Sequence, residues 1–285
     1  MILSFHPCFG ADGHIILGDR KLNGEDFLLI RRADVIILPQ SCSFELHEAC
    51  KNYSALLFPN YETRFEYPGK IGQSLLFDKL KCPHPETIRW PSVEKYRASN
   101  PLGKKYPHKL PFFLKADKSH EAEGVYLVTD GKVLESALES LSHLEKSGFR
   151  GFISQELISS QGNVLRAVIL GKRVVTYWKR IDSPGQIVST ISRGAKLDKD
   201  WRPDLQEKGC NHAQNFATEA GVNLAAIDFV FPLADPDPQP LFLEINYYFG
   251  RRGFGGSENY YRLLYEAIQE WLREKGFDPK GVTLL

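Results

Sequence analysis

The amino-acid sequence predicts a mixed α/β fold of the α+β type, because strand-like and helix-like segments alternate along the 285 residues. Two short apolar runs near the start, 1–5 and 34–38, are each ended by a proline, which is typical of buried parallel strands. Later, two runs rich in β-branched and aromatic residues, 225–231 and 241–246, flank a proline-rich loop and indicate a hairpin. We therefore expect a small N-terminal α/β unit followed by a larger α+β region.

Residues 1–75 make up the predicted N-terminal unit, with a helix over 43–52 and a third strand over 55–58. The loops after its strands lie where open parallel sheets bind ligands. His6 lies in the first of these loops. A histidine beside proline is more often a turn residue than a substrate contact, and we favour the turn.

The rest of the chain divides into segments with clear periodicity and end signals. Predicted helices cover 71–81, about 131–146, 203–220 and 257–275, and predicted strands cover 112–116, 125–128, 152–158, 164–170, 173–179, 225–231 and 241–246. Gly171 and Lys172 suit a type II′ turn between the strands 164–170 and 173–179. Gly148 and Gly221 are natural stops for the helices that precede them.

The two strands of the predicted hairpin carry acids among apolar residues. Side chains alternate across a strand, so Asp228 points away from the face that Ile227 and its apolar neighbours share. In the second strand the expected apolar face consists of Leu241, Leu243 and Ile245, which leaves Glu244 and Asn246 on the other face. The hairpin therefore has one apolar face and one face with three oxygen-bearing side chains.

The register of this hairpin decides what the three side chains can do. If Phe231 pairs with Leu241, Asp228 lies directly across from Glu244, with Cβ atoms about 5 Å apart. Two carboxylates that close repel each other unless a cation lies between them, and Mg²⁺ prefers oxygen ligands. We therefore favour a metal site at Asp228, Glu244 and Asn246. The alternative is a solvated hairpin with acids on its wet face.

Three basic residues each allow two interpretations. Arg166 lies within an apolar strand, where an unpaired charge is expensive, so it needs an anionic partner. A structural carboxylate and a ligand are equally good candidates. Lys115 comes near the end of its strand before the polar loop 117–124, a flap that could fold over phosphates. Lys79 closes a helix, and a solvated side chain is the usual outcome for either lysine alone.

Composition limits the classes of partner. Lys and Arg number 36 against 35 Asp and Glu, so no global field attracts nucleic acid or a membrane surface. The five cysteines are odd in number and form no Cys-x-x-Cys pair, which favours a reducing, cytoplasmic setting. We expect no signal peptide and no membrane span. Oligomeric state is left open, a homo-oligomer included.

Eight short segments occur together in an order that resembles the ATP-grasp superfamily, most closely the ribosomal-protein glutamate ligases, glutathione synthetases and D-alanine–D-alanine ligases. They are Asp78-Lys79, 112–115, 119–124, 154–158, 165–168, 192–195, 227–229 and 243–246. The resemblance covers about residues 70–285. It implies two α+β subdomains that clasp ATP, at about 76–153 and 154–285 of a domain over 76–285, after a small Rossmann-like domain over 1–75.

The resemblance also implies roles for residues. ATP would be bound by Lys79 and Lys115 at its phosphates, by Ser119 and Gly124 of the flap, and by Glu156, Leu157 and Asn163 at its nucleoside. Asp228, Glu244 and Asn246 would hold Mg²⁺, with Mn²⁺ as an alternative. Arg166 and Arg193 would stabilise the transferring phosphoryl group and the acyl intermediate.

The implied activity is ligation of a carboxylate to an amine or thiol through an acyl phosphate, on small-molecule or peptide substrates. A kinase or phosphotransferase and a non-catalytic ATP-binding module are the alternatives. Two departures from the family pattern matter. The acid expected to bind ribose is replaced by Val164, with Asn163 as a stand-in. The loop after Asn246 carries Arg251 and Arg252, which suggests an acidic acceptor; a solvated loop is an equal alternative.

Overall fold

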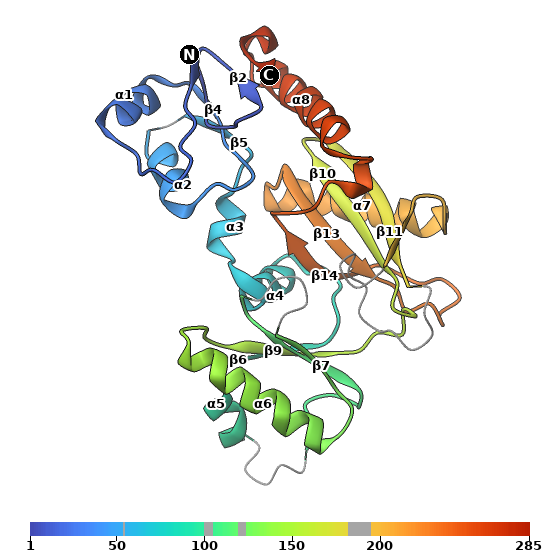
Figure 1. Cartoon of the computed structure of the whole chain (residues 1–285). Coiled ribbons are helices and arrows are strands. Elements are labelled where there is room, and N and C mark those ends of the chain that lie inside the picture. The colour runs from blue at the N-terminus through green and yellow to red at the C-terminus, as the bar shows by residue number, and fades with distance from the viewer. Residues whose placement is uncertain (54, 100–104, 119–123, 182–194) are drawn as a thin grey trace.

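The structure is a computed structural model of the chain, in which residues 1–53, 55–99, 105–118, 124–181 and 195–285 are described. Three sheets of four, four and five strands form separate layers (Figure 1). Figure 1 shows the first sheet with the N-terminal helices at the top left, the second at the bottom and the third between them on the right. Helix α4 lies between the second and third sheets, and α3 leads into it from the N-terminal unit.

The N-terminal unit is a parallel sheet, as its apolar runs predict, and its strand order is β3-β1-β4-β5. Its elements are β1 (Ile2–Ser4), β2 (Phe9–Gly10), β3 (Gly13–His14), α1 (Gly24–Arg32), β4 (Val35–Ile37), α2 (Phe44–Lys51), β5 (Leu56–Phe58) and α3 (Glu62–Glu66). Helix α1 was not predicted, although Asn23 and Asp26 form a capping box at its start. That spacing was the missed signal.

The second sheet is antiparallel, in the order β6-β9-β7-β8. Its part of the chain consists of α4 (Gly69–Lys79), β6 (Thr87–Trp90), α5 (Val93–Ser99), β7 (Phe112–Ala116), β8 (Val125–Val128), α6 (Gly131–Lys146) and β9 (Phe152–Glu156). Helices α5 and α6 cover the face of the sheet that points away from the rest of the molecule (Figure 1). Strand β6 and helix α5 were not predicted.

The third sheet has the order β12-β11-β10-β13-β14, and all its neighbours are antiparallel. It is built from β10 (Val164–Leu170), β11 (Arg173–Arg180), β12 (Lys196–Asp198), β13 (Leu224–Val230) and β14 (Leu241–Asn246), with α7 (Pro203–Ala220), η2 (Arg252–Phe254), α8 (Ser257–Glu274), η3 (Pro279–Gly281) and β15 (Thr283–Leu284). The predicted hairpin of β10 and β11 is confirmed, and Gly171 has the positive φ, +63°, that a type II′ turn requires at this position.

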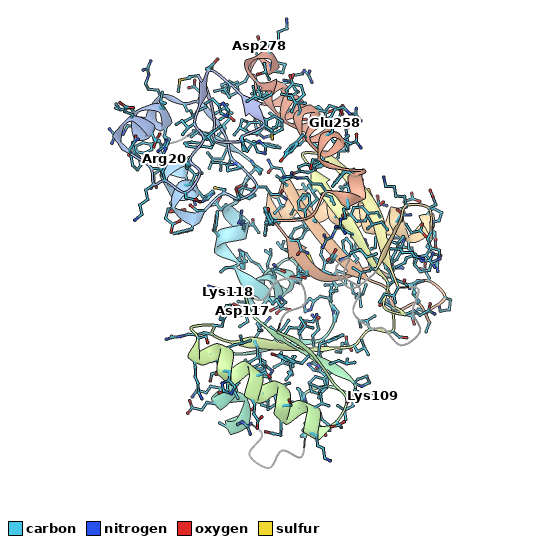
Figure 2. All side chains as sticks on the ribbon, in the orientation of Figure 1. Arg20, Lys109, Asp117, Lys118, Glu258 and Asp278 are labelled. Atoms are coloured by element: carbon cyan, nitrogen blue, oxygen red, sulfur yellow. The ribbon has the colours of Figure 1, made fainter. Side chains whose placement is uncertain are left out.

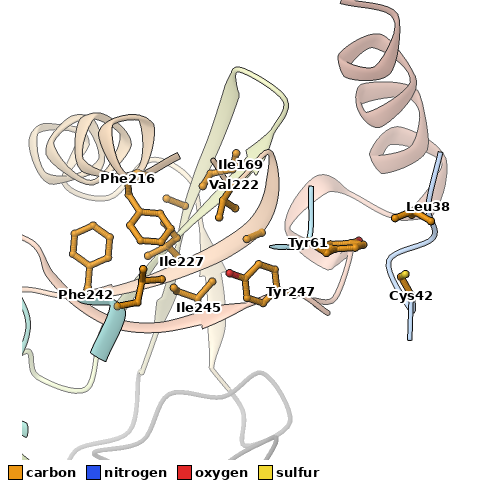
Figure 3. Close-up of a cluster of buried hydrophobic side chains, with 14 of the residues drawn as sticks. Leu38, Cys42, Tyr61, Ile169, Phe216, Val222, Ile227, Phe242, Ile245 and Tyr247 are labelled. Carbon is orange, nitrogen blue, oxygen red and sulfur yellow. The ribbon is translucent and has the colours of Figure 1, made fainter. Parts of the chain in front are cut away.

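One hydrophobic core joins the third sheet to the N-terminal unit. It runs from Phe216 on α7 through Ile245 on β14 to Tyr247, Tyr61 and Cys42 (Figure 3). The second sheet packs on its own cluster, which includes Phe112 on β7 and Leu138 on α6 and shares no residue with the first. The N-terminal unit and the third sheet therefore form one packed body, and the second sheet is a separately cored lobe.

The two ends of the chain lie together, because β15 pairs with β2 (Figure 1). All five cysteines are free thiols. Within the described ranges, every helix is too short or too polar to cross a membrane. The predicted boundaries at 75/76 and 153/154 fall inside α4 and β9. The division into domains remains a prediction.

Candidate functional site

A cavity lies between the second sheet, helix α4 and strand β14 of the third sheet. Its lining residues are Lys70, Gln73, Ser74, Phe77, Thr87, Lys115, Ile153, Gln155, Leu243 and Glu244. Of the residues predicted to form the site, Lys115 and Glu244 are among them. The cavity thus collects basic side chains from α4 and β7 and a carboxylate from β14.

Lys115 is buried against neutral groups. Its Nζ donates to Gln155 Oε1 at 2.6 Å and lies 5.2 Å from the centroid of the Phe113 ring. Gln155 in turn donates to Thr87 Oγ1, which fixes the direction of its amide. Burial lowers the pKa of Lys115 to about 8, and Lys70 adds to this effect while Glu244 opposes it. Such an ammonium gains from any anion that enters the cavity.

The second lysine of the cavity is Lys70, where the sequence predicted Lys79. Both lie on α4, nine residues and therefore about 13 Å apart along the helix axis. Lys79 is at the exposed C-terminal end, where it donates to Tyr67 Oη at 2.7 Å and lies 3.9 Å from Glu66. Lys70 lies in the first turn, and its Nζ is 3.6 Å from Glu244 Oε1.

The position of Lys70 is fixed by contacts of α4 with both sheets. Asp117, at the end of β7, accepts from the Ile71 amide at 2.7 Å and so caps the helix (Figure 2). Gly69 adopts φ +70°, and a Cβ there would lie 2.4–2.6 Å from the Asp117 carboxyl group. Gln73 makes hydrogen bonds of 2.8 and 2.9 Å to the backbone of Ile245 on β14.

A lysine in the first turn of a helix was a signal that could have been read from the sequence. The positive end of the helix dipole disfavours a cation there, and both the lysine and the helix terminus favour a bound anion. Lys70 therefore lies where an anion in the cavity would be favoured, and the role expected of Lys79 remains a prediction.

Asp228 and Glu244 are partners across β13 and β14, as predicted, but the assumed register is wrong. Leu241 pairs with Val230, and a bulge beside Asp228 and Phe229 restores the pairing of the two acids. The extra residue is Leu243. It leaves the apolar face and lines the cavity beside Glu244, so the expected face of Leu241, Leu243 and Ile245 is also corrected.

Arg166 pairs with Asp228, which decides between the two partners considered for it in favour of a structural carboxylate. Its Nε and Nη2 donate to Oδ1 and Oδ2 of Asp228, each at 2.8 Å, in a bidentate fork. The two residues face each other across β10 and β13. The pair lies almost out of contact with solvent, with side chains 12% and 6% exposed. Arg166 and Lys179 hold the pKa of Asp228 far below its ordinary value, although burial acts against them.

Lys179 on β11 also binds Asp228, and it was not predicted. Its Nζ donates to Asp228 Oδ2 at 2.8 Å, and its side chain is 8% exposed. Burial lowers the pKa of Lys179, while Asp228 opposes that shift. Lys179 is the last residue of the predicted strand 173–179 and is followed by Arg180, so the sequence did not mark it as a buried charge in the way it marked Arg166.

The three oxygen-bearing side chains fit a magnesium ion by their chemistry and their closeness. Glu244 is the register partner of Asp228, and Asn246 Nδ2 lies 3.4 Å from Asp228 Oδ2. Among the described residues no group of three or more His, Cys, Asp or Glu side chains is arranged to hold a metal, so the amide of Asn246 would have to complete the set. Glu244 has 34% of its side chain exposed, against 6% for Asp228, and is the more open of the two acids.

The residues expected around the nucleoside do not line the cavity. Glu156 ends β9, and its Oε1 accepts from the Glu86 amide at 2.8 Å. Asn163 is buried, donates to the Ser160 carbonyl and accepts from the Ile181 amide at 3.4 Å. Leu157 follows β9 and is half-buried. Their roles in ATP binding remain predictions.

The remaining predicted residues lie elsewhere. The Arg251 guanidinium stacks on Tyr261, 4.4 Å from the ring centroid, and Arg252 is exposed at the start of η2. Neither lines the cavity. Gly124 has φ +64°, and its carbonyl accepts from the Ala116 amide at the base of the flap. Ser119 and Arg193 lie outside the described residues.

Buried His6 has the structural role of a turn residue. Its Nδ1 accepts from the Cys8 amide at 3.1 Å, within the loop that follows β1. Burial lowers its pKa to about 4, and Arg251 and His14 add to that effect. The imidazole is therefore neutral at physiological pH.

Solved structures show which fold this is. The chain matches the D-alanine–D-alanine ligase from Bacillus anthracis with a TM-score of 0.62 over 92% of this chain and 89% of that one, at 13% identity. It matches a RimK domain ATP-grasp protein from Sphaerobacter thermophilus with a TM-score of 0.58 over 92% and 97%, at 15% identity. The protein has the ATP-grasp fold, and the resemblance seen in the sequence is confirmed.

The curated relatives that match the chain include probable alpha-L-glutamate ligases. The chain is 27% identical over 176 residues to a probable alpha-L-glutamate ligase from Shewanella baltica, covering 61% of this chain and 54% of the relative. It is 30% identical over 152 residues to a probable alpha-L-glutamate ligase from Coxiella burnetii, covering 52% and 45%. The chain thus spans about half the length of the curated relatives it matches. No family model matches it.

Proposed function

We propose that the protein is an ATP-dependent ligase that activates a substrate carboxylate as an acyl phosphate and joins it to an amine. The observation that carries the proposal is the buried Lys115 ammonium, held by neutral groups in a cavity that also contains Lys70 and faces Glu244. The ATP-grasp fold and the glutamate ligases among the relatives support it.

In this proposal Lys70 and Lys115 bind the phosphates of ATP from α4 and from β7. Both are point charges that suit phosphate oxygens. Glu244, Asp228 and Asn246 would hold Mg²⁺ on the opposite side, with Mn²⁺ as an alternative. The ion would neutralise charge on the β- and γ-phosphates. Glu156, Leu157, Asn163, Ser119 and Gly124 are proposed to bind the rest of the nucleotide.

The proposed chemistry needs no nucleophile from the protein. A carboxylate oxygen of the substrate attacks the γ-phosphorus, and the bond to the β-phosphate oxygen breaks to release ADP. The amine then attacks the acyl carbon, loses a proton, and phosphate leaves. Lys115 and Lys70 orient the γ-phosphate and balance its charge. Arg193 is proposed to act at the acyl intermediate, and Arg166 acts through Asp228.

The acceptor substrate is proposed from two arginines and from the relatives. Arg251 and Arg252 follow β14 and favour an acidic substrate, with Arg251 held on Tyr261. Because the relatives include probable glutamate ligases, glutamate and peptides that end in glutamate are the first substrates to test. The proposed cytoplasmic location agrees with the five free thiols.

The test is ADP release by the full chain with Mg²⁺ across a matrix of acids and amines, glutamate among the acids. A ligase releases ADP only when both an acid and an amine are present. ADP release with an acid or alcohol alone, together with a stable phosphorylated product, would instead show a kinase. ATP binding with no ADP release under any pair would leave a non-catalytic module.

A further inference from the structure

Asp228 carries an excess of positive partners. Its single negative charge meets two positive charges, the Arg166 guanidinium and the Lys179 ammonium, all at 2.8 Å. The three side chains are 12%, 8% and 6% exposed for Arg166, Lys179 and Asp228, so water screens these charges poorly. The cluster of Arg166, Lys179 and Asp228 therefore carries a net positive charge at the site proposed for a divalent cation.

The two cations are not equivalent. Arg166 is the register partner of Asp228 on the adjacent strand, and its fork occupies both carboxylate oxygens. Lys179, on β11, is the register partner of Val164 on β10, so its side chain must cross β10 to reach β13. Two strand spacings amount to about 9.6 Å, and the extended lysine side chain, the 2.8 Å hydrogen bond and the aspartate side chain together cover that distance.

The carboxylate oxygen that Lys179 contacts places its ammonium beside the proposed metal site. Its ammonium donates to Oδ2 of Asp228, which also accepts from Arg166 Nη2 at 2.8 Å and lies 3.4 Å from Asn246 Nδ2. Asn246 and Glu244 are the other two side chains that would hold the ion. Lys179 thus lies at the oxygen that faces the rest of the proposed metal site, while Arg166 holds the carboxylate from the β10 side.

We propose that Lys179 is a resident counter-cation of Asp228, which keeps the site closed to a bare divalent ion and releases Oδ2 when the ion arrives with a nucleotide. The ammonium then pairs with a phosphate oxygen. The inference rests on the proposed binding of Mg-ATP and deepens it, because it makes occupation of the metal site depend on the nucleotide. Lys179 is accordingly a positioning residue for the metal and a ligand of the phosphates.

The physical reason is charge balance. A free divalent cation entering a cluster that already carries net positive charge is repelled, whereas a cation that brings a triphosphate adds net negative charge. Lysine suits this exchange because it is a compact charge on a flexible stem, and arginine in a bidentate fork does not.

The test measures Mn²⁺ binding to the full chain without nucleotide, from the loss of the free-ion electron paramagnetic resonance signal. We expect Lys179→Met to bind Mn²⁺ at least about tenfold more tightly than the wild type, because a cation about 3 Å from the carboxylate is removed. Lys179→Met is also expected to bind ATP about tenfold more weakly in the presence of EDTA, since a charge on the phosphates is lost.

The matched control is Lys172→Met. Lys172 is also on the β10–β11 hairpin, but its side chain is 77% exposed and pairs with Glu274 at 2.7 Å. Its Mn²⁺ affinity should equal that of the wild type. Adding Asp228→Asn to Lys179→Met should abolish the gain. If Lys179→Met does not fold, Lys179→Gln serves instead, because its amide can still donate to Oδ2 without charge.

The outcomes separate this inference from the proposed function. A purely structural Lys179 predicts lower thermal stability of the variants with unchanged or weaker Mn²⁺ binding, and that result overturns the inference even if the wild type makes ADP. Tighter Mn²⁺ binding in the variant supports the inference even if no acid and amine pair gives ADP, in which case only the proposed activity fails. If neither the wild type nor the variant binds Mn²⁺, the inference falls, and the proposed activity is still decided by ADP release alone.

Discussion

The two sheets on either side of the cavity differ in whether a buried charge has a counter-charge. On β7, the Lys115 ammonium lies against a glutamine oxygen and an aromatic ring, and no described carboxylate lies within 4 Å of it. On β13, the Asp228 carboxylate is held by a guanidinium and an ammonium. A buried charge without a counter-charge costs stability, and removal of one member of a buried ion-pair network leaves the remaining charges in that same costly state.

This contrast separates binding from stability. The lobe with Lys115 has its own core and keeps a cation that a bound anion would neutralise. The body with Asp228 uses its charges to tie three strands of one sheet together. We therefore expect loss of Lys115 to damage nucleotide binding and loss of Asp228 to damage the fold.

The largest effect is expected from Asp228→Ala. The substitution leaves the Arg166 and Lys179 charges buried without their partner, which should lower the free energy of unfolding by about 3–5 kcal/mol. Urea denaturation followed by circular dichroism measures it. Asp204→Ala, which breaks the exposed pair with Arg202, is the control and should change stability far less. Equal losses in both variants would contradict the contrast between the two sheets.

Lys115→Met should weaken ATP binding and leave stability intact. Because a buried ammonium is replaced by an apolar side chain of similar length, stability should be unchanged or increased. ATP affinity should fall by about 10- to 100-fold, as expected when a charge-assisted contact is lost. Calorimetric titration with ATP, together with urea denaturation, gives both numbers. A large loss of stability with intact ATP binding would place Lys115 among the structural charges.

The pKa of Lys115 predicts a pH dependence. The folded protein loses the Lys115 proton near pH 8 and the unfolded chain near 10.5, so between these values unfolding takes up a proton and stability rises with pH. ATP affinity should change the other way, and be about tenfold weaker at pH 9 than at pH 7, because the neutral amine no longer attracts phosphate. Calorimetric titration at both pH values measures the change. Lys115→Arg should bind ATP with little change over this range.

Glu244→Gln tests the half-exposed acid of the hairpin. Because its side chain is 34% exposed and 3.6 Å from Lys70, the loss of stability should stay below about 1 kcal/mol. The Mg²⁺ concentration for half-maximal ATP binding should rise about tenfold, because the substitution replaces a charged carboxylate ligand with a neutral amide. An unchanged Mg²⁺ requirement would remove Glu244 from the proposed metal site.

The smallest effects come from the two lysines of α4. Lys70→Ala should weaken ATP binding about fivefold, because one cation of the cavity is lost. Lys79→Ala, at the exposed end of the same helix, should change it less than about twofold. Titration of both variants with ATP compares them directly. The reverse ranking would restore the role first expected of Lys79.

The hairpin shows where prediction from the sequence succeeds and where it stops. The pairing of Asp228 with Glu244 was predicted from alternation, but the register behind it was off by one residue. The bulge at Leu243 shifts the pairing by one residue, so that Asp228 and Glu244 still lie opposite each other. Periodicity identifies which residues share a face, and a bulge is a local departure that no period contains.

The two missed lysines had different causes. Lys179 was missed because it ends the predicted strand beside Arg180, where a solvated lysine is the usual outcome. Lys70 was missed because the Asp-Lys pair at 78–79 looked like the expected motif. In the structure Asp78 pairs instead with Arg89 at 2.6 Å and with His84 at 2.9 Å. A short motif cannot tell which end of a helix faces a cavity.

The sequence by itself determined most of the long strands and helices, the parallel N-terminal sheet and the acidic hairpin, because these depend on local periodicity and on the conformational limits of proline and glycine. Only the tertiary structure decided which charges meet. Arg166, Lys179 and Asp228 come from three different strands, and Lys70 reaches Glu244 through the docking of α4 on β14. Long-range packing sets those distances, and no local pattern encodes them.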